Sequence, residues 1–551
     1  MIFPKMEPAG PRRRESLIRH YALLALGYAV LGVLFTWPLI LHFTTHTPAA
    51  DESGDQFQTI WFFWWMKKAL FTLHQSPFWT NDIYYPYGTG LGYHLSPFSN
   101  LLAIAVSLLT GAAINSATVF NALLLLSFVI TGLASFLLIR QVTESPPVAF
   151  WGSIFVTVSP YRLWHLNHLN LLSFGWGLLA IHFTLRMLQE PRRRFAFAAV
   201  ASFGAMFYAC LTGTSFVVFF LAAYVAVNAR SLWRHPQRPR VLRLGLFAVA
   251  GAVLIALPGL VALHQTDSVW DTRWKGLVLF SASLFDYLVP SAEASLVARW
   301  FGLGSGFAPG LSGEIFLGWL LLAAASVIII AARHRVSPRW LILSLVFLVL
   351  SLGPTVKIGG HRYLQGLLPY RWLFEAIPYL SLGRTPGRLA VLTQFCLVVF
   401  TAQGLTLWLG PFGRIVTTAI RRAALYGLGI VATVIVLFAE YTPGSIALWE
   451  MTVPGLYYEL AADSSIHAVY DGPIAASSQI CNRYMYWQTI HGKKEANGYL
   501  THASRDSWKL LDRMSQWRKF GQVERAELVA AQIDAIVYHE LSGEVRLMRL
   551  R

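Results

Sequence analysis

The chain has 551 residues, of which 55% are hydrophobic and only 13% are charged, and its mean hydropathy is +0.51. Soluble proteins carry about 25% charged residues. The composition therefore indicates an α-helical polytopic membrane protein and excludes disordered, collagen-like, coiled-coil and small disulfide-rich chains. The net charge is +17. In a soluble protein that excess would suggest nucleic-acid binding, but in a membrane protein basic residues gather in cytoplasmic loops.

The N-terminal segment carries Arg12, Arg13 and Arg14 before the first apolar run. This basic flank resembles the start of a signal peptide. However, the run at residues 20–42 is long enough to span a bilayer, and no small-residue cleavage site is evident. We therefore expect a retained membrane anchor. The three cysteines are scattered and offer no disulfide framework.

Eleven stretches are apolar enough to cross a bilayer, which takes about 20 residues and somewhat fewer inside a helix bundle. They are residues 20–42, 117–140, 147–160, 170–188, 195–211, 213–229, 241–263, 312–332, 339–354, 387–409 and 423–441.

Basic clusters recur at every second connection between these spans, which predicts a cytoplasmic N-terminus and an external C-terminus. The segments assigned to the cytoplasm hold 21 of the 44 basic residues but four of the 27 acidic residues. The inside therefore carries +17 and the outside zero. The charge orients the chain, and a nucleic-acid partner loses its support.

The predicted external face carries most of the polar sequence. We expect a transmembrane domain at 1–441 with a long first external loop at 43–116. We also expect a small external α/β domain at 442–551, where a strand-like stretch at 533–539 follows a helix-like one at 504–532. No internal repeat is evident, unlike many transporters.

The first external loop opens with the carboxylates Asp51, Glu52 and Asp55. An acid at the bilayer surface can serve as a general base toward a membrane-bound substrate, although acids are also ordinary in a solvated loop. The aromatic stretch 56–70 follows and is too interrupted to span. Because Trp prefers the membrane interface, we expect a helix lying on the surface.

Further along this loop, residues 77–94 combine Tyr, Trp, Asn and Asp with turn-forming Gly and Pro. Asp82 and His94 in this stretch are candidate sugar-binding residues, since aromatic faces stack on sugar rings and polar groups bind hydroxyls. An ordinary aromatic loop is the alternative. Residues 97–112 predict a second surface or re-entrant helix.

The second external loop contains Tyr161, Arg162, His165 and His168. Two histidines three residues apart share a helix face, but no third metal ligand is visible. Together with Arg162 they would suit a phosphate group. The alternative is an interfacial helix start with amphipathic side chains.

Arg384 and Arg388 lie at the predicted external mouth of the tenth span. Basic residues there depart from the orientation rule, and a helix start favours anions. A lipid phosphate would explain the pair, and so would a salt bridge with Glu375. In the loop after the seventh span, Asp286 either contacts substrate or packs. Neither a phosphate-binding loop nor a hydrolase motif is present.

Several of these pieces recur together in a known pattern. They are Gly54-Asp55, Trp61 to Trp65, the Tyr84-Tyr-Pro turn, Ser159 to His168, Ser283 to Pro290, Arg384 to Arg388 and Met485 to Leu500. The set resembles, over nearly the whole chain, a large family of bacterial membrane proteins described as glycosyltransferases. Its layout is similar to the GT-C superfamily, which includes protein mannosyltransferases and aminoarabinose transferases.

The resemblance implies a bacterial inner-membrane enzyme whose site faces the periplasm or exterior. It implies a polyprenyl-phosphate-linked sugar donor, a glycan, lipid or protein acceptor, and inverting transfer without a metal or cofactor. Asp55 matches the family's catalytic base, with Asp51 as its rival. At the second acidic position of the family this chain instead has His165 and His168. Arg384 and Arg388 would stabilise the departing lipid phosphate.

Two other functions stay open at this point. A lipid or polysaccharide transporter or flippase would share a pocket for an anionic lipid but would need no base. A non-catalytic envelope assembly protein would use residues 442–551 as its binding domain.

Overall fold

The computed structural model of the chain describes most of its residues. These are 11–49, 54–264, 273–291, 293–303, 315–332, 334–358, 361–377, 385–415, 419–473, 478–517, 522–540 and 544–550.

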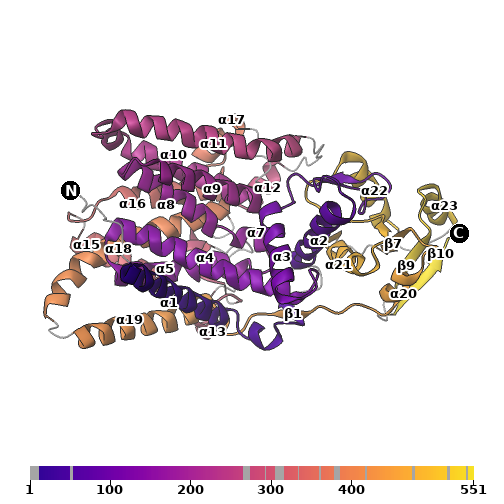
Figure 1. Cartoon of the computed structure of the whole chain (residues 1–551), viewed down its shortest axis with the longest axis horizontal. Helices are drawn as coiled ribbons and strands as arrows, with labels where there is room; N and C mark the ends of the chain where they lie inside the picture. The colour runs from indigo at the N-terminus through magenta and orange to yellow at the C-terminus, as the bar shows by residue number, and fades with distance from the viewer. Residues whose placement is uncertain are drawn as a thin grey trace.

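Long helices running side by side form the larger part of the molecule (Figure 1). They are α1 (Pro11–Phe35), α4 (Ala117–Thr143), α5 (Pro146–Thr157), α8 (Gly175–Gln189), α9 (Arg193–Ala209), α10 (Leu211–Trp233), α11 (Arg238–His264), α15 (Trp319–Ala332), α16 (Arg339–Ser351), α18 (Ala390–Ile415) and α19 (Ala419–Tyr441). Local sequence sets their ends. The Ser116 hydroxyl accepts the Val119 amide at the start of α4, and two prolines open α5, where a missing backbone N–H costs nothing.

Within the described residues, seven helices are long and apolar enough to cross a membrane. They are Ile18–Phe35, Ala117–Thr143, Leu169–Gln189, Leu211–Trp233, Arg238–His264, Pro386–Trp408 and Ala423–Tyr441. Helices also occupy the other four predicted spans, but α5, α9, α15 and α16 are each shorter than 18 residues. The predicted multi-pass membrane protein is supported, whereas the predicted number of eleven spans is not established.

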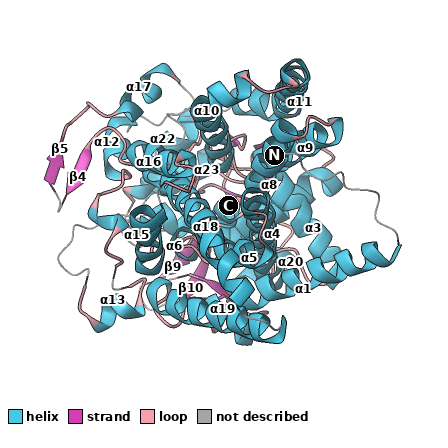
Figure 2. Ribbon diagram, turned by 90° about the vertical axis from the view of Figure 1, so that its left-hand side faces the viewer, coloured by secondary structure: helices cyan, strands magenta, loops and turns pink. Residues whose placement is uncertain are grey.

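Helix α18 lies at the centre of the bundle, with α15 and α16 on one side and α4 and α5 on the other (Figure 2). In its most apolar part, 83% of the residues are buried, against 17% in the corresponding parts of α11 and α19 at the periphery. The start of α18 is therefore held firmly, which matters because a candidate phosphate-binding arginine lies there.

The chain also has shorter elements. They are η1 (Leu39–His42), β1 (His46–Pro48), α2 (Asp55–Lys67), η2 (Lys68–Thr72), β2 (Trp79–Thr80), β3 (Thr89–Gly90), α3 (Pro97–Thr110), α6 (Pro160–Trp164), α7 (Leu169–Leu172), α12 (Arg273–Leu279), η3 (Phe285–Tyr287), α13 (Leu296–Trp300), β4 (Val356–Ile358), β5 (His361–Tyr363), α17 (Pro369–Ala376) and η5 (Pro386–Leu389). Among them, α2 and α3 lie at the end of the bundle that faces the C-terminal sheet (Figure 1).

The C-terminal residues form a four-stranded sheet flanked by helices. Its strand order is β10-β9-β7-β8, and β9, β7 and β8 are parallel while β10 is antiparallel to β9. The elements from β6 onward are β6 (Leu448–Glu450), α20 (Leu456–Ala462), β7 (Ala468–Gly472), η6 (Ser478–Ile480), α21 (Cys481–His491), β8 (Lys494–Glu495), α22 (Arg505–Ser515), α23 (Gln522–Ala530), β9 (Ala535–His539) and β10 (Val545–Arg549).

Helix α2 lies between the bundle and the C-terminal residues (Figure 1), where it packs against α21 and α3. Trp61 and Trp65 are fully buried, so these aromatic side chains of α2 pack inside the protein. The Trp61 indole donates a 2.6 Å hydrogen bond to Gln488 in α21. The aromatic face is covered by a segment more than 400 residues away, which a local pattern cannot reveal.

The first loop and the C-terminal sheet are also joined through their backbones. The Glu495 amide donates to the Asp82 carbonyl at 2.7 Å, and the Tyr85 amide donates to the Glu495 carbonyl at 3.0 Å. Strand β1 of the first loop also pairs antiparallel with β6. The C-terminal residues are thereby fixed over the first loop and α2.

Candidate active site

Asp55 begins α2, after Gly54 in an extended conformation. An acid in the first turn is favoured there, because the helix dipole places partial positive charge at this end. One carboxylate oxygen lies 2.6 Å from His168 Nε2, and the other accepts a 3.3 Å hydrogen bond from the Asn482 side chain. The Asp55 side chain is 35% exposed and that of His168 is 29% exposed, so a substrate can reach both.

His168 comes from the turn between α6 and α7, which places it opposite the start of α2. Its Nδ1 lies 2.6 Å from the Asn167 side-chain oxygen, so both ring nitrogens face oxygen atoms. The His165 ring packs edge-on against it, with the ring centroids 5.2 Å apart. His165 is buried, and its Nδ1 is 2.7 Å from the Tyr161 carbonyl.

Arg388 lies in η5, directly before α18, and is half-buried. The turn is fixed from behind, since the Gly387 amide donates to the Phe280 carbonyl at 3.0 Å. The guanidinium lies close enough for its charge to act on both Asp55 and His165. The first loop, the α6–α7 turn and the start of α18 therefore meet at one place.

The pKa values show how these charges act on one another. Burial raises the pKa of Asp55, but His168, Arg388 and the Asn482 amide together lower it by more, so it falls below its usual value. Burial lowers the pKa of His165 well below its usual value, and the charges of Arg388 and His168 lower it further. Asp55 is thus held as a carboxylate while the His165 ring is held neutral.

An apolar cavity of about 770 Å³ lies beside this cluster. Side chains of α8, α9, α10 and α11 line it, together with Thr385, Pro386 and Leu389 next to Arg388. The lining follows α11 from Gly245 to Leu263, which is about 27 Å of helix at 1.5 Å per residue. The cavity therefore runs along the membrane-spanning part of the bundle.

Other predicted site residues have partners inside the protein. Buried Arg162 donates to the backbone carbonyls of Thr157 and Leu172 and to the hydroxyls of Thr131 and Ser127, and it stacks over Phe128. These bonds fix the α6–α7 turn that carries His168, so Arg162 supports the site from behind. Tyr161 is buried and contacts His165 through its carbonyl and its ring.

Asp82 and His94 lie where the first loop meets the C-terminal residues. Asp82 is buried in an ion pair with Lys68, and His94 Nε2 accepts the backbone amide of His502 at 2.9 Å. The Asp286 carboxylate accepts a hydrogen bond from the Ser283 backbone amide and so caps its own turn. Asp51 and Arg384 lie outside the described residues, so the predicted arginine pair is described only at Arg388.

Sequence reasoning missed Asn482. It is the second residue of α21 and contacts Asp55 across 427 positions of sequence. The stretch from Met485 to Leu500 belongs to the resemblance described above, but nothing in the local pattern assigns the preceding asparagine to the first-loop acid. The contact requires the C-terminal residues to fold over α2.

Residues 24–448 match the family described as "Domain of unknown function (DUF6311)", which is well over half of the chain. The chain belongs to the DUF6311 family. No curated protein matches it. The match to DUF6311 ends before the four-stranded sheet, so Asn482 lies beyond the matched region whereas Asp55, His168 and Arg388 lie within it.

Two solved structures show what fold this DUF6311 protein has. The oligosaccharyltransferase of Archaeoglobus fulgidus in its apo form is similar with a TM-score of 0.51 at 12% identity, covering 87% of this chain and 64% of that one. The arabinofuranosyltransferase AftD from Mycobacteria is similar with a TM-score of 0.56 at 14% identity, covering 96% of this chain and 37% of that one. The chain spans less than two thirds of either protein. The fold of the chain is therefore similar to the folds of these two enzymes, which supports the predicted helical membrane architecture.

Proposed function

We propose that the chain is a membrane glycosyltransferase that moves a sugar from a polyprenyl-phosphate donor to an acceptor on the external face of the membrane. One observation carries this proposal. Asp55 contacts His168 and Asn482 and is influenced by the charge of Arg388, which lies next to residues that line a long apolar cavity. Both structural neighbours are glycosyl-transferring enzymes by name, which supports the same class of reaction.

The reaction would be a displacement at the anomeric carbon with inversion. The acceptor oxygen forms a bond to that carbon while the bond to the lipid phosphate breaks. The acceptor proton passes to Asp55, and polyprenyl phosphate leaves with the electron pair. His168 and Asn482 orient the Asp55 carboxylate, and its partial exposure leaves room for the acceptor hydroxyl. A positioned base of this kind contributes about 10²–10⁴-fold to a rate.

Arg388 and the cavity would bind the two parts of the lipid donor. A guanidinium matches phosphate oxygens in two parallel hydrogen bonds, and the apolar walls suit a polyprenyl chain, at about 0.8 kcal/mol per buried CH₂. Because Thr385, Pro386 and Leu389 belong to the cavity wall, the phosphate would lie at Arg388 while the chain extends along α11.

The proposed transfer uses no metal. The Arg388 guanidinium supplies positive charge near the Asp55 carboxylate, and in the proposed reaction it would perform the electrostatic role that a cation would otherwise have.

The experiment that tests the function uses the purified chain in lipid nanodiscs with a panel of polyprenyl-phosphate sugars and candidate acceptors. We expect release of polyprenyl phosphate from at least one donor and an inverted anomeric configuration in the product. Donors with truncated chains should react with a raised KM. Lipid movement between leaflets without release of polyprenyl phosphate would instead support a flippase, which the same cavity would also serve.

A second expectation concerns Asn482 as a positioning residue. Replacing it with Ala removes one hydrogen bond to a charged group, which is worth about 1.5–3 kcal/mol, so kcat should fall by about tenfold or more. The pKa of Asp55 should rise, because this bond lowers it, and the acidic limb of the pH–rate profile should move to higher pH. A profile that keeps its shape would show that Asn482 does not act through Asp55.

A further inference from the structure

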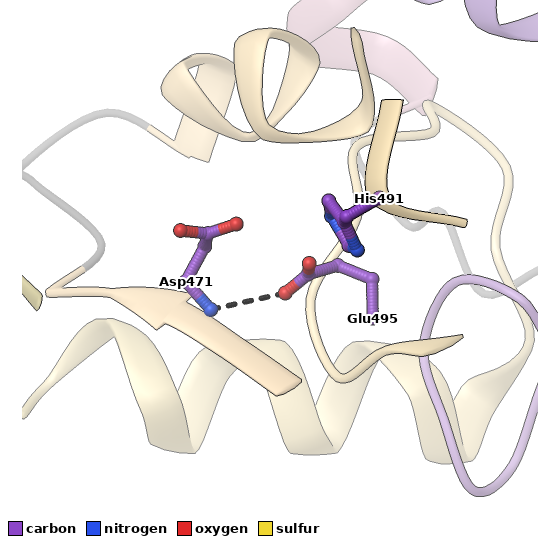
Figure 3. A group of neighbouring side chains, drawn as sticks. All are labelled: Asp471, His491 and Glu495. Carbon is purple, nitrogen blue, oxygen red and sulfur yellow. Dashed lines mark hydrogen bonds between the residues drawn. The ribbon is translucent and has the colours of Figure 1, made fainter. Parts of the chain in front are cut away.

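Three ionisable side chains meet in the C-terminal sheet, away from the candidate active site (Figure 3). Asp471 lies near the carboxyl end of β7, Glu495 at the carboxyl end of β8, and His491 at the end of α21. Strands β7 and β8 are parallel neighbours, so their carboxyl ends lie at the same edge. This is the edge of a parallel sheet at which ligands usually bind.

The cluster is buried and incompletely satisfied. Asp471 and Glu495 are 0% exposed and His491 is 4% exposed. The potential ligand atoms of the three residues all lie within 4.8 Å of one another. Apart from the contact between the Asp471 and Glu495 side chains, Asp471 Oδ2, His491 Nε2 and Glu495 Oε2 have no hydrogen-bond partner among the described residues. Three buried polar atoms without partners are costly, and two adjacent buried carboxylates repel each other.

The remaining atoms of the two carboxylates are held in place. Asp471 Oδ1 accepts the Tyr457 hydroxyl at 2.6 Å and lies 2.9 Å from His539 Nε2. Glu495 Oε1 accepts the Asp471 backbone amide at 3.0 Å, shown as the dashed line in Figure 3. Each carboxylate therefore has one oxygen anchored to the protein and the other left over. Partners on the outer oxygen are characteristic of ligands that are oriented for a metal ion.

Neighbouring lysines do not supply the missing positive charge. Lys68 pairs with Asp82, and Lys493 donates to the Asp463 carbonyl at 2.7 Å. Their described bonds thus point away from the cluster. His539 pairs with Asp471 Oδ1, so a bound cation would compensate the two inner carboxylate oxygens that His539 does not face.

We propose that Asp471, His491 and Glu495 bind a divalent transition-metal ion of the Zn²⁺ or Mn²⁺ type. One imidazole and two carboxylates form a mixed nitrogen–oxygen ligand set that suits these ions. Ligand distances of about 2.0–2.2 Å would draw the three groups slightly closer together than they are. Binding through Nε2 would leave the ring proton on Nδ1, so the 3.1 Å contact from the Lys493 amide to Nδ1 would be replaced.

The position of this ion indicates a structural role. It would link β7, α21 and β8 where Glu495 also pairs through its backbone with the first loop. His491 is nine residues beyond Asn482 on α21, or about 14 Å along the helix. The ion would therefore lie outside the transfer site and would fix the helix that presents Asn482 to Asp55. The inference is independent of the proposed glycosyl transfer, because metal content can be measured without any substrate.

The test is elemental analysis of the full chain purified in detergent without chelator, and again after incubation with Zn²⁺ or Mn²⁺ and removal of excess ion. We expect one ion per chain, and a melting temperature that falls with chelator and recovers when the ion is returned. Glu495→Gln should lower the metal content by about tenfold or more. Asp506→Asn, an exposed acid of the same region that pairs with Lys509, is the matched control and should keep the ion.

Two results would overturn the proposal. One is a wild-type chain that holds no ion after incubation and whose melting temperature changes with neither metal. That result would mean that the two carboxyl groups share a proton instead. The other is an ion that persists in both Glu495→Gln and His491→Gln, which would place it elsewhere. If Glu495→Gln does not fold, His491→Gln and the wild-type metal titration decide the matter.

Discussion

Replacing Asp55 with Asn should lower the rate of sugar transfer by about 10²–10⁴-fold, which is the usual contribution of a positioned general base. The amide keeps the size of the side chain and can still contact Asn482, but it cannot take a proton from the acceptor. The measurement is release of polyprenyl phosphate at saturating donor and acceptor. Donor binding should change little, since the proposed phosphate contact belongs to Arg388.

The control for this change is Asp506→Asn, which also removes one acid but lies on an exposed surface with Lys509. It should leave the rate and the melting temperature as in the wild type. An Asp55→Asn protein that folds normally and transfers at the wild-type rate would eliminate Asp55 as the base. Normal lipid translocation combined with no transfer in either protein would favour a flippase.

The pH dependence follows from the lowered pKa of Asp55. A carboxyl group whose folded pKa is depressed contributes stability above its unfolded pKa, about 3.9 for Asp, and that contribution is lost as pH falls through the folded value. Asp55 should therefore remain charged throughout the neutral and mildly acidic range. Between about pH 7 and pH 5 its own titration should leave the transfer rate unchanged, and the Asp55→Asn protein should show no acidic limb from this group.

The sequence indicates individual candidate residues but not their partners. Asp55 is a candidate from its place after the first span and from the family resemblance, with Asp51 as its rival, and His168 is a candidate from its spacing to His165. The 2.6 Å contact between them joins positions 113 residues apart and depends on how α2 and the α6–α7 turn meet. No local pattern contains that information.

Buried polar residues were the least predictable part of the site. In sequence, Arg162 and Asp82 look like exposed binding groups, because charged side chains in loops usually face water. In the structure Arg162 fixes the turn behind His168, and Asp82 pairs with Lys68 beneath the C-terminal residues. The Asp471, His491 and Glu495 cluster escaped notice for the same reason, since its members come from three separate elements.

Span prediction succeeded where hydropathy and length agree. Helices such as α4 and α11 have 27 residues and each contains a long apolar stretch. The stretches around α5 and α16 are apolar too, but these helices have only 12 and 13 residues. Hydropathy measures how apolar a segment is, whereas helix length is set by caps, prolines and packing against neighbours.

Replacing Arg388 with Ala should reduce kcat by about 10²–10³-fold, the usual cost of losing one group that stabilises charge developing in a transition state. As the bond to the sugar breaks, negative charge grows on the lipid phosphate, and the guanidinium at the start of α18 would meet it there. The Arg388→Lys protein should keep only part of the wild-type rate, because an ammonium group cannot form the paired hydrogen bonds of a guanidinium. Steady-state kinetics with a full-length donor measure both effects.

The same substitution should act on Asp55, which gives the prediction a second readout. Arg388 lowers the pKa of Asp55 through its charge. Arg388→Ala should therefore move the acidic limb of the pH–rate profile to higher pH, whereas Arg388→Lys keeps the charge and should leave this limb nearly unchanged. Arg371→Ala is the matched control, since this arginine pairs with Glu375 on an exposed helix. A rise in KM with unchanged kcat would show that Arg388 binds the donor equally in the ground state and transition state, and would remove it from leaving-group stabilisation.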